Sequence, residues 1–282
     1  NNSVQHHTDY GLYSTDSDSN SFTNNTFNNN SINVLLSASL TNTFTNNSIS
    51  GSAIGMQVKS SSTSLTLINN TINATSLPSL EVNDSNSVTL SANKIYNDVR
   101  FDNADSATFN KNNTIQTNLN ITDSDSLTIS NNNLQYVNIQ TTTGSTFSGN
   151  TLIQLITNTY TGNIYSNTIA NNNLTAFDLY TVTNTNLYDN NIQNTTIGIL
   201  LTNASNKNTI YDNWLKDNAF GLNVTGSTSN TLYNNYFENT VNVYDDSSNT
   251  WYTTYACGTP NIVGGPCQGG NFNSDYYGLD NG

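Results

Sequence analysis

Charged residues are scarce in this sequence. Its 282 residues include six Lys plus Arg against nineteen Asp plus Glu, which gives a formal net charge of −13. Phosphate binding draws on clustered Lys and Arg, so we expect no nucleic-acid partner and no attachment to an anionic membrane surface. No run approaches the roughly 18 apolar residues that a membrane-spanning helix needs.

Apolar residues are also few. They make up 34 % of the chain, below the roughly 45–50 % of an ordinary globular domain, while Asn supplies 57 residues and Ser plus Thr another 75. This balance excludes a thick, dry core. An Asn-rich disordered tract is the simplest alternative, but such a tract would not carry 16 Tyr and 10 Phe with the large apolar residues in phase.

The chain contains two cysteines, one methionine and three prolines. Cys257 and Cys267 lie ten residues apart in a Gly- and Pro-rich tail with no histidine nearby, so they favour a disulfide in an oxidising compartment over a zinc site. The first residue is Asn1 rather than Met. We therefore expect a processed N-terminus and a secreted, extracellular or cell-surface protein.

An asparagine recurs with an apolar residue three positions before it and another two after it. Phe44 and Ile49 flank Asn47 in this way, and Leu187 and Ile192 flank Asn190. A fixed period of about 20 residues is the mark of a solenoid. The series, which we call the ladder asparagines, is Asn25, Asn47, Asn70, Asn93, Asn113, Asn132, Asn150, Asn167, Asn190, Asn213 and Asn235.

Each repeat reads as two or three short strands joined by polar corners. Residues 54–58 and 197–201 alternate apolar residues with Gly or polar ones, which is typical of a strand with one buried face. Asn, Ser, Thr and β-branched residues rank low in helix propensity. The period is too short for a propeller blade, and the leucine-rich consensus is missing. The sequence therefore predicts an all-β fold, a single-stranded right-handed parallel β-helix of about 11 turns.

In such a fold, equivalent residues of successive turns stack about 4.8 Å apart. A buried amide is costly when unpaired, but a column of asparagines can pass hydrogen bonds from turn to turn. Only the turn at Asn113 departs from this spacing, because Phe109 lies four residues before the asparagine instead of three, while Ile115 lies two after it as in the other turns. We interpret this as a one-residue bulge.

The pattern divides the chain into three parts. Residues 22–249 carry the repeat and form the β-helix. Residues 1–21 fall outside the pattern and are predicted to be an N-terminal arm or cap. Residues 250–282 also leave it and form a C-terminal cap that contains the disulfide, because the open ends of a solenoid need covering.

The tail from Asn249 reads NTWYTTYACGTPNIVGGPCQGGNFNSDYYGLDNG. It resembles the C-terminal signature of NosD-like parallel β-helix proteins of bacterial periplasms and archaeal cell surfaces, in which a Trp precedes stretches like NIIGGP, GGNYWSDY and G-x-D. Trp251 and residues 261–266, 269–271 and 274–276 match, whereas Asn273 replaces a Trp. The resemblance implies the fold and an archaeal cell-surface location; one fold carries many activities.

Right-handed β-helices include polysaccharide lyases and hydrolases. Lyase chemistry needs an Arg or Lys base beside carboxylates that hold Ca²⁺. The single arginine, Arg100, lies near Lys94 and Lys111, and aligning the turns stacks Asp84 on Asn103 and Asp123. A column of like charges favours a bound cation, although Asp and Asn are also ordinary turn residues. The Ca²⁺ candidates are Asp102, Asp105, Asp123 and Asp125.

Two other features suggest binding. Tyr188, Tyr211 and Tyr233 each lie two residues before a ladder asparagine, so they should form an outward column that contacts glycans or another subunit. His6 and His7 are the only histidines. NosD relatives are linked to copper, but no Met-rich or Cys-rich copper motif occurs, so no cofactor is expected to be required.

N-x-Ser/Thr sequons are no more frequent than composition predicts, yet exposed ones would be modified in a secreted protein that meets an oligosaccharyltransferase. Besides Asn1, the candidates are Asn24, Asn29, Asn46, Asn69, Asn73, Asn83, Asn112, Asn120, Asn173, Asn194, Asn203 and Asn223.

These observations favour a non-enzymatic extracellular structural protein. We expect a rigid β-helical rod at a cell surface or in a filament or lattice, built with other surface subunits or copies of itself. A carbohydrate-binding β-helix is the first alternative, and a polysaccharide lyase or hydrolase around Arg100 is the second.

Overall fold

The computed structural model describes residues 1–76, 78–170 and 174–276. The chain divides into two compact units, Asn1–Thr151 and Leu152–Gly282, which we call unit 1 and unit 2. Every regular element of the described residues is a β-strand, so none of them forms a helix long and apolar enough to cross a membrane. The all-β prediction is confirmed.

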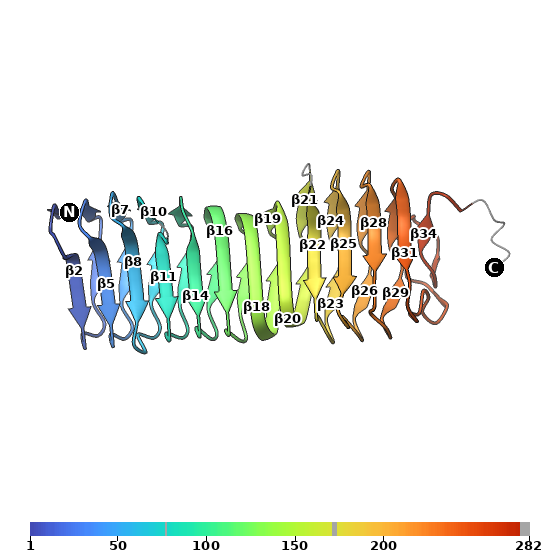
Figure 1. The fold of residues 1–282 in the computed structure, drawn as a ribbon, viewed down its shortest axis with the longest axis horizontal. Helices are drawn as coiled ribbons and strands as arrows, with labels where there is room; N and C mark the ends of the chain where they lie inside the picture. Colours follow the sequence, from blue (N-terminus) through green and yellow to red (C-terminus); the bar gives the residue numbers. More distant parts are fainter. Residues whose placement is uncertain (77, 171–173, 277–282) are drawn as a thin grey trace. The chain divides into compact units, whose positions relative to one another are not determined.

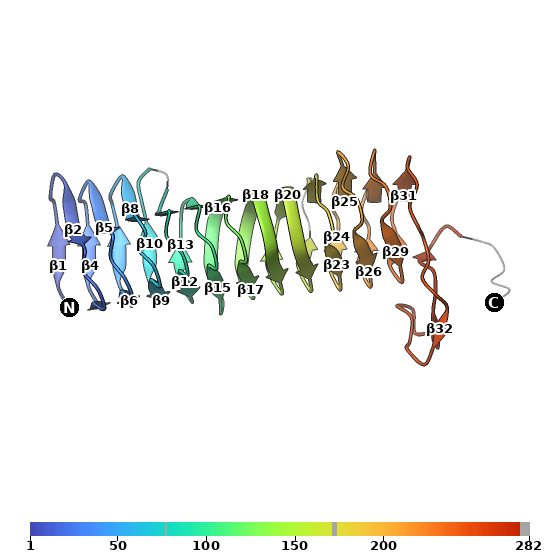
Figure 2. The ribbon, with the colours of Figure 1, turned by 90° about the horizontal axis from the view of Figure 1, so that it is seen from below.

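Unit 1 is a parallel β-helix whose strands recur in three rows (Figures 1 and 2). Its strands are β1 (Ser3–Gln5), β2 (Tyr10–Thr15), β3 (Ser21–Thr23), β4 (Thr26–Asn28), β5 (Ile32–Ser37), β6 (Thr43–Thr45), β7 (Ser48–Ser50), β8 (Ile54–Lys59), β9 (Thr66–Ile68), β10 (Thr71–Asn73), β11 (Leu80–Asn83), β12 (Thr89–Ser91), β13 (Lys94–Ile95), β14 (Val99–Asp102), β15 (Thr108–Asn110), β16 (Thr114–Thr122), β17 (Thr128–Ser130) and β18 (Asn133–Ser148). β19 (Thr151–Leu152) lies at the unit boundary.

Each row of unit 1 runs through successive turns with parallel pairing. The first row follows the ladder asparagine and holds β1, β4, β7, β10, β13 and the start of β16. The second row holds β2, β5, β8, β11, β14, and the later parts of β16 and β18. The third row precedes the next ladder asparagine and holds β3, β6, β9, β12, β15, β17 and the end of β18.

Unit 2 repeats the same three rows. Its strands are β20 (Gln154–Tyr165), β21 (Thr168–Ala170), β22 (Thr175–Tyr180), β23 (Asn186–Tyr188), β24 (Asn191–Gln193), β25 (Ile197–Thr202), β26 (Thr209–Tyr211), β27 (Trp214–Lys216), β28 (Phe220–Val224), β29 (Thr231–Tyr233), β30 (Tyr236–Glu238), β31 (Val241–Asp245), β32 (Ala256–Cys257), β33 (Cys267–Gln268) and β34 (Phe272–Asn273). β21, β24, β27, β30 and β34 pair in parallel as its first row.

The core is a stack of apolar side chains from successive turns. In the three-residue strands only the central residue points inward, as Phe44, Leu67 and Leu90 do in the third row of unit 1, where each is fully buried. Space near the second row is tight. An added Cβ at Gly198 would lie 2.6 Å from the carbonyl oxygen of Gly221, so only glycine fits there.

The residue before each ladder asparagine turns the corner between the third and first rows. It adopts a left-handed backbone with φ between 52° and 64°, a conformation that Asn, Asp and Gly tolerate best. This requirement explains the Asn-Asn and Asp-Asn doublets of the sequence. The corner residues are Asn24, Asn46, Asn69, Ala92, Asn112, Asn131 and Gly149 in unit 1, and Ser166, Asp189, Asp212 and Asn234 in unit 2.

The irregular turn at Asn113 contains the predicted bulge. Phe109 pairs with Leu90, and Asn113 stays in the ladder, so one additional residue lies between them. Lys111 and Asn112 both adopt left-handed conformations, whereas the same corner has one such residue before the ladder asparagine in the other turns. The bulge is confirmed.

The two ends of the chain are more regular than the sequence pattern indicated. Residues 1–21, predicted to lie outside the repeat, form a turn of the same kind, because β1 and β2 pair in parallel with β4 and β5. In the C-terminal segment, β34 returns to pair with β30 after an antiparallel hairpin of β32 and β33. The predicted disulfide, Cys257–Cys267, is confirmed and joins the two hairpin strands.

Candidate functional site

The ladder asparagines of unit 1 are buried and bonded from turn to turn. Oδ1 of Asn70 accepts hydrogen bonds from the backbone N–H (2.9 Å) and Nδ2 (3.0 Å) of Asn47. Nδ2 of Asn70 donates in turn to Oδ1 of Asn93 and to the carbonyl oxygen of Phe44. The same turn-to-turn bonds connect Asn25, Asn47, Asn70, Asn93, Asn113, Asn132 and Asn150.

The ladder in unit 1 begins one turn earlier than predicted. The backbone N–H and Nδ2 of Asn2 both donate to Oδ1 of Asn25, at 3.0 and 3.2 Å. The signal for Asn2 was present in the sequence, since Val4 lies two residues after it and pairs with Phe27. The apolar residue before it was missing, so the spacing rule did not find it.

Unit 2 contains its own ladder of Asn167, Asn190, Asn213 and Asn235. Oδ1 of Asn271 then accepts from the backbone N–H (3.0 Å) and Nδ2 (2.9 Å) of Asn235. The chain travels 36 residues between these two asparagines, because the hairpin interrupts the repeat. No search for a fixed period would find Asn271.

Unit 2 also holds two shorter ladders at its other corners. The backbone N–H groups of Asn208 and Asn230 donate to the side chains of Asn230 and Asn249. On the other side, Asn218 accepts from Thr195 and donates to Asn239. Asn208, Asn218 and Asn230 each lie five residues from Asn213 or Asn235, a signal in the sequence that sequence reasoning missed.

The three tyrosines of the predicted outward column stack on one another in unit 2. Tyr188 and Tyr211 have ring centroids 4.9 Å apart, and Tyr211 and Tyr233 5.2 Å, with interplanar angles of 7° and 4°. Tyr165 extends the column at 4.7 Å from Tyr188. The half-buried rings cover one another's faces, so this column presents mainly ring edges to solvent.

Two corner carboxylates lie beside the tyrosine column. Nδ2 of Asn234 donates a hydrogen bond to Oδ1 of Asp212. Partial burial raises the pKa of both Asp189 and Asp212, and the charge of Asp189 adds to the effect at Asp212. Burial, the adjacent tyrosines and these carboxylates raise the pKa of Tyr211 to about 12. This corner disfavours added negative charge.

A second aromatic stack, which the sequence analysis missed, follows the other side of the same corner. Trp214 and Tyr236 have centroids 3.7 Å apart, and Tyr236 and Phe272 4.7 Å. The carboxylate of Glu238 accepts a hydrogen bond from the hydroxyl of Tyr236 (2.6 Å). It also forms an ion pair with Nζ of Lys216 (3.0 Å). These two partners lower the pKa of Glu238. The stack is therefore fixed on one flank.

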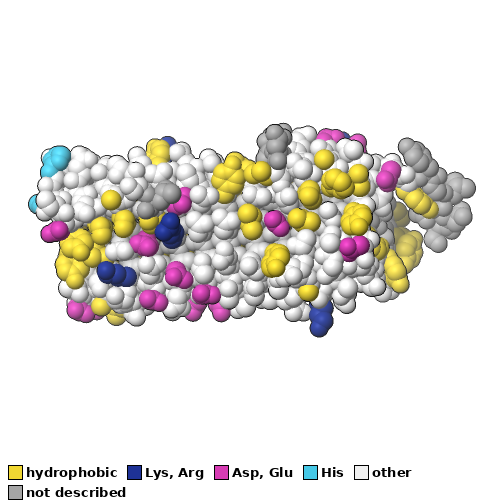
Figure 3. Space-filling view, viewed as in Figure 1, with side chains coloured by type: hydrophobic (Ala, Val, Ile, Leu, Met, Phe, Trp, Pro, Cys, Tyr) yellow, Lys and Arg dark blue, Asp and Glu magenta, His cyan; other side chains and the backbone are white. Residues whose placement is uncertain are grey.

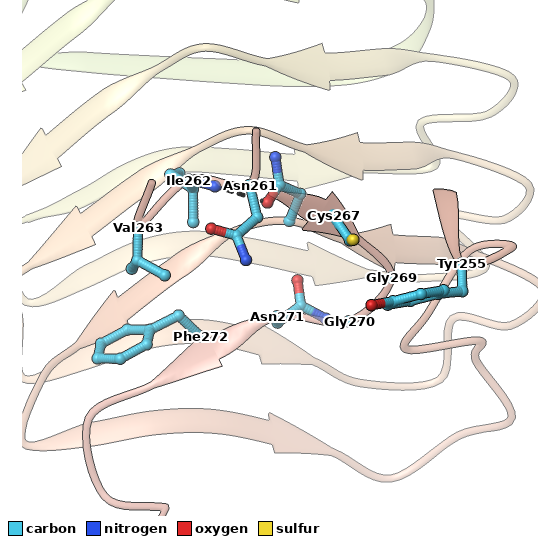
Figure 4. A pocket seen from close by; sticks show the side chains of 10 residues that line it. Tyr255, Asn261, Ile262, Val263, Cys267, Gly269, Gly270, Asn271 and Phe272 are labelled. Carbon is cyan, nitrogen blue, oxygen red and sulfur yellow. Dashed lines mark hydrogen bonds between the residues drawn. The ribbon is translucent and has the colours of Figure 1, made fainter. Parts of the chain in front are cut away.

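The C-terminal hairpin encloses a pocket of about 380 Å³ in unit 2 (Figure 4). The hairpin is attached to the corner by the backbone N–H of Ile262, which donates to Oδ1 of Asn234 (2.8 Å). Tyr255 and Phe272 lie on opposite sides of the pocket, with Asn261 and Asn271 between them. The pocket combines aromatic rings with amides, and no sequence pattern indicated it.

The residues around Arg100 are spread over the exposed surface of unit 1. Arg100 lies between Glu81 and Asn120 in the second row, with its side chain exposed. Lys94 lies over the ring of Tyr96, with Nζ 4.8 Å from the centroid. Figure 3 shows how sparse the charged side chains are on one face.

The stacking of the unit 1 aspartates follows the predicted alignment. Nδ2 of Asn103 donates to Asp84 (2.7 Å), and the backbone N–H groups of Asp125 and Thr143 donate to Asp105 and Asp125 (2.7 Å each). Asp84 thus accepts from a side-chain amide, and Asp105 and Asp125 accept from the backbone of the next turn. Asp102 and Asp123 have exposed side chains. Within residues 1–76, 78–170 and 174–276, no three His, Cys, Asp or Glu side chains converge on a metal position.

The sequons occupy two kinds of position. Asn24, Asn46, Asn69 and Asn112 are exposed left-handed corner residues, and each precedes a ladder asparagine and the Ser or Thr that opens the first-row strand. These four motifs therefore follow from the fold. Asn29, Asn73, Asn194 and Asn203 are also exposed, Asn83, Asn120 and Asn223 are half-buried in strands, and Asn173 lies outside the described residues.

The family comparison agrees with this architecture. The family described as periplasmic copper-binding protein (NosD) matches residues 79–278, and the family described as right handed beta helix region matches residues 1–134. The chain belongs to the NosD family. No curated protein matches the sequence at a significant level. The predicted right-handed parallel β-helix of NosD type is thus confirmed.

The described residues of this NosD member do not fit a copper centre. Met56 is fully buried, both cysteines are in the disulfide, and His6 and His7 are exposed in the first turn. The backbone N–H of His7 donates to Asn30, but no third ligand joins the pair among the residues described. The described residues therefore provide no set of copper ligands that would correspond to the family's description.

Solved structures share the fold at low identity. The A-module of a mannuronan C-5 epimerase from Azotobacter vinelandii has a TM-score of 0.53 at 11 % identity, over 80 % of this chain and 79 % of that one. A DFA-IIIase from Arthrobacter chlorophenolicus (TM-score 0.29, 11 % identity, 76 % and 54 % covered) and a hyper-glycosylated TibA fragment (0.30, 12 %, 89 % and 100 %) are more distant. The epimerase likeness shows the fold alone.

Proposed function

We propose that this NosD-family protein is a non-enzymatic structural protein that acts outside the cytoplasm, at a cell surface or in an extracellular filament or lattice. The observation that carries the proposal is the fully bonded asparagine ladder inside each unit. Oδ1 of Asn213, for example, accepts two hydrogen bonds, while the two N–H bonds of its Nδ2 are shared among three acceptor oxygens. Such a core resists unfolding without relying on charge.

Few side chains titrate, and the pKa shifts of their carboxylates have opposite effects on stability. Burial raises the pKa of Asp178, Asp189 and Asp212, so these groups favour the folded state at low pH. Hydrogen bonds lower the pKa of Glu238 and Asp246, so these two lose stabilisation as the pH falls. We therefore expect cooperative unfolding to persist at pH 3. Its loss there, measured by circular dichroism during a thermal scan, would contradict the proposal.

Activity assays test the non-enzymatic part. Arg100 is exposed, and neighbouring carboxylates such as Asp105 and Asp125 bind backbone N–H groups. We expect no cleavage or epimerisation of neutral polysaccharides or of mannuronan, assayed by reducing ends, unsaturated products and proton NMR. Turnover by the wild type that Arg100→Ala abolishes would establish the enzyme alternative instead.

Electron microscopy of native material tests the assembly part. We expect filaments or a lattice, because a structural protein acts through repeated contacts with other subunits. Isolated particles at all accessible concentrations would contradict that part. Glycans on exposed corner sequons such as Asn46 are part of the proposal, and a native mass equal to the bare chain would remove them.

A further inference from the structure

We propose that the pocket beneath the C-terminal hairpin of unit 2 binds a neutral oligosaccharide through pyranose stacking on Phe272 and Tyr255. This binding goes beyond the structural role, which does not need it. The starting point is the end of the second aromatic stack. Phe272 is its terminal ring, with one face against Tyr236 at 4.7 Å and an interplanar angle of 13°.

The free face of Phe272 distinguishes it from the tyrosine column. In that column the rings of Tyr188 and Tyr211 cover one another, whereas Phe272 has a ring neighbour on one side only among the described residues and keeps 36 % of its surface exposed. Tyr255 lines the same pocket from the hairpin and is 68 % exposed. Both rings offer apolar surface to the C–H face of a sugar.

Hydrogen-bonding groups lie between and beside these rings. Oδ1 of Asn261 accepts from the backbone N–H of Gly265 (2.7 Å), which fixes the carboxamide. Its Nδ2 has no protein partner among the described residues and lines the pocket. Tyr255, whose side chain carries a hydroxyl, is exposed as well. A sugar hydroxyl can therefore accept from the amide while its ring stacks on an aromatic face.

An adjoining groove provides acceptors. It shares Asn234, Asn261 and Ile262 with the pocket and is also lined by Asp189 and Asp212. Carboxylates accept hydrogen bonds from sugar hydroxyls, but they repel the carboxylates of a polyuronate. The net charge of −13 adds to this repulsion. The chemistry therefore selects a neutral oligosaccharide and rejects an acidic one.

Isothermal titration of the full chain with cellohexaose, mannohexaose and xylohexaose, with a mannuronan hexamer for comparison, tests the proposal. We expect at least one neutral hexaose to bind with a Kd below about 1 mM and the mannuronan hexamer to bind more weakly. Tyr255→Ala should weaken binding by about tenfold, the upper end of one aromatic stacking contact. Tyr252→Ala is the matched control, because Tyr252 is equally exposed but does not line the pocket.

Two further variants separate binding from folding. Phe272→Ala removes the stacking surface but also a strand contact, so Gly270→Leu is the complementary test. A Cβ at Gly270 would meet no atom within 4 Å, and the larger side chain would occupy pocket space without disturbing the fold. We expect Gly270→Leu to abolish binding with an unchanged unfolding midpoint.

The proposal is overturned if no neutral hexaose binds, if the mannuronan hexamer binds as tightly, or if Tyr252→Ala costs as much affinity as Tyr255→Ala. If no oligosaccharide binds but the protein still unfolds cooperatively at pH 3, only the proposal of a binding site is contradicted. If an oligosaccharide binds but unfolding at pH 3 is not cooperative, the proposed structural role is contradicted instead.

Discussion

Removing one amide from the ladder is the most direct test of what holds this fold together. In the Asn213→Ala variant, the backbone N–H and Nδ2 of Asn190 lose the oxygen to which they donate at 3.1 and 2.9 Å. The carbonyl oxygen of Leu187 loses the Nδ2 donor at 2.8 Å. Asn213 is fully buried, so bulk water does not replace these partners.

The magnitude follows from the groups left without partners. Nδ2 of Asn190 keeps its bonds to the carbonyl oxygens of Ile164 and Tyr188, so the group left without a partner is the Asn190 backbone N–H. An unsatisfied buried group costs about 1–3 kcal/mol. This is a large part of the roughly 5–15 kcal/mol that stabilises a typical domain.

Guanidinium unfolding followed by circular dichroism measures this loss, with Asn191→Ala as the matched control. Asn191 is exposed, and Gln193 (2.6 Å) is the one donor to its Oδ1 among the described residues. We expect the control to change the free energy of unfolding by less than about 0.5 kcal/mol. If Asn213→Ala falls within that same range, the ladder does not stabilise the fold, and the reasoning is refuted.

Three other predictions address the bulge, the tyrosine column and the corner charge. Deleting Lys111 should leave the melting temperature unchanged or raised, because Asn112 still turns the corner, whereas deleting Ala92 in a regular turn should cost about 2–6 kcal/mol by moving a ladder amide out of register. Equal effects of the two deletions would contradict the bulge. Tyr211→Ala should cost about 1–3 kcal/mol for two ring contacts, and Tyr211→Phe should not; a similar loss in both would show that the hydroxyl matters instead. Burial raises the pKa of Asp212, so the folded state binds a proton at this carboxylate more tightly than the unfolded state does. The free energy of unfolding therefore falls as the pH rises from the pKa of Asp212 in the unfolded chain to its higher pKa in the folded chain. Asp212→Asn should therefore be more stable than wild type at pH 7 and equal to it near pH 3, and a constant difference in urea unfolding at both pH values would exclude this cause.

The repeat could be predicted from the sequence because each ladder amide has two constraints that spacing reveals. The apolar residues before and after it must point inward, and the amide must lie at a constant place in each turn. For Asn47 this fixes Phe44 and Ile49, which the structure buries completely. The tyrosine column followed from the same register, since Tyr211 lies two residues before Asn213.

The C-terminal site could not be predicted, because its parts come together only through tertiary structure. The hairpin separates Asn235 from Asn271, so the last ladder bond has no period. Trp214, Tyr236 and Phe272 stack across turns, but only the first two lie one regular repeat apart. A pattern search detects constant spacing, but this site forms after Asn235, where the hairpin interrupts the constant spacing of the ladder asparagines.

The same geometry explains why sequons recur at the ladder corners without a need for glycans. A left-handed corner favours Asn, the next residue must be the ladder Asn, and the following strand opens with Ser or Thr, as in Asn46, Asn47 and Ser48. Backbone conformation and buried hydrogen bonding thus produce N-x-Ser/Thr motifs by themselves. Glycosylation at these corners would use residues that the fold already requires, and adjacent corners about 4.8 Å apart leave room for a glycan on only some of them.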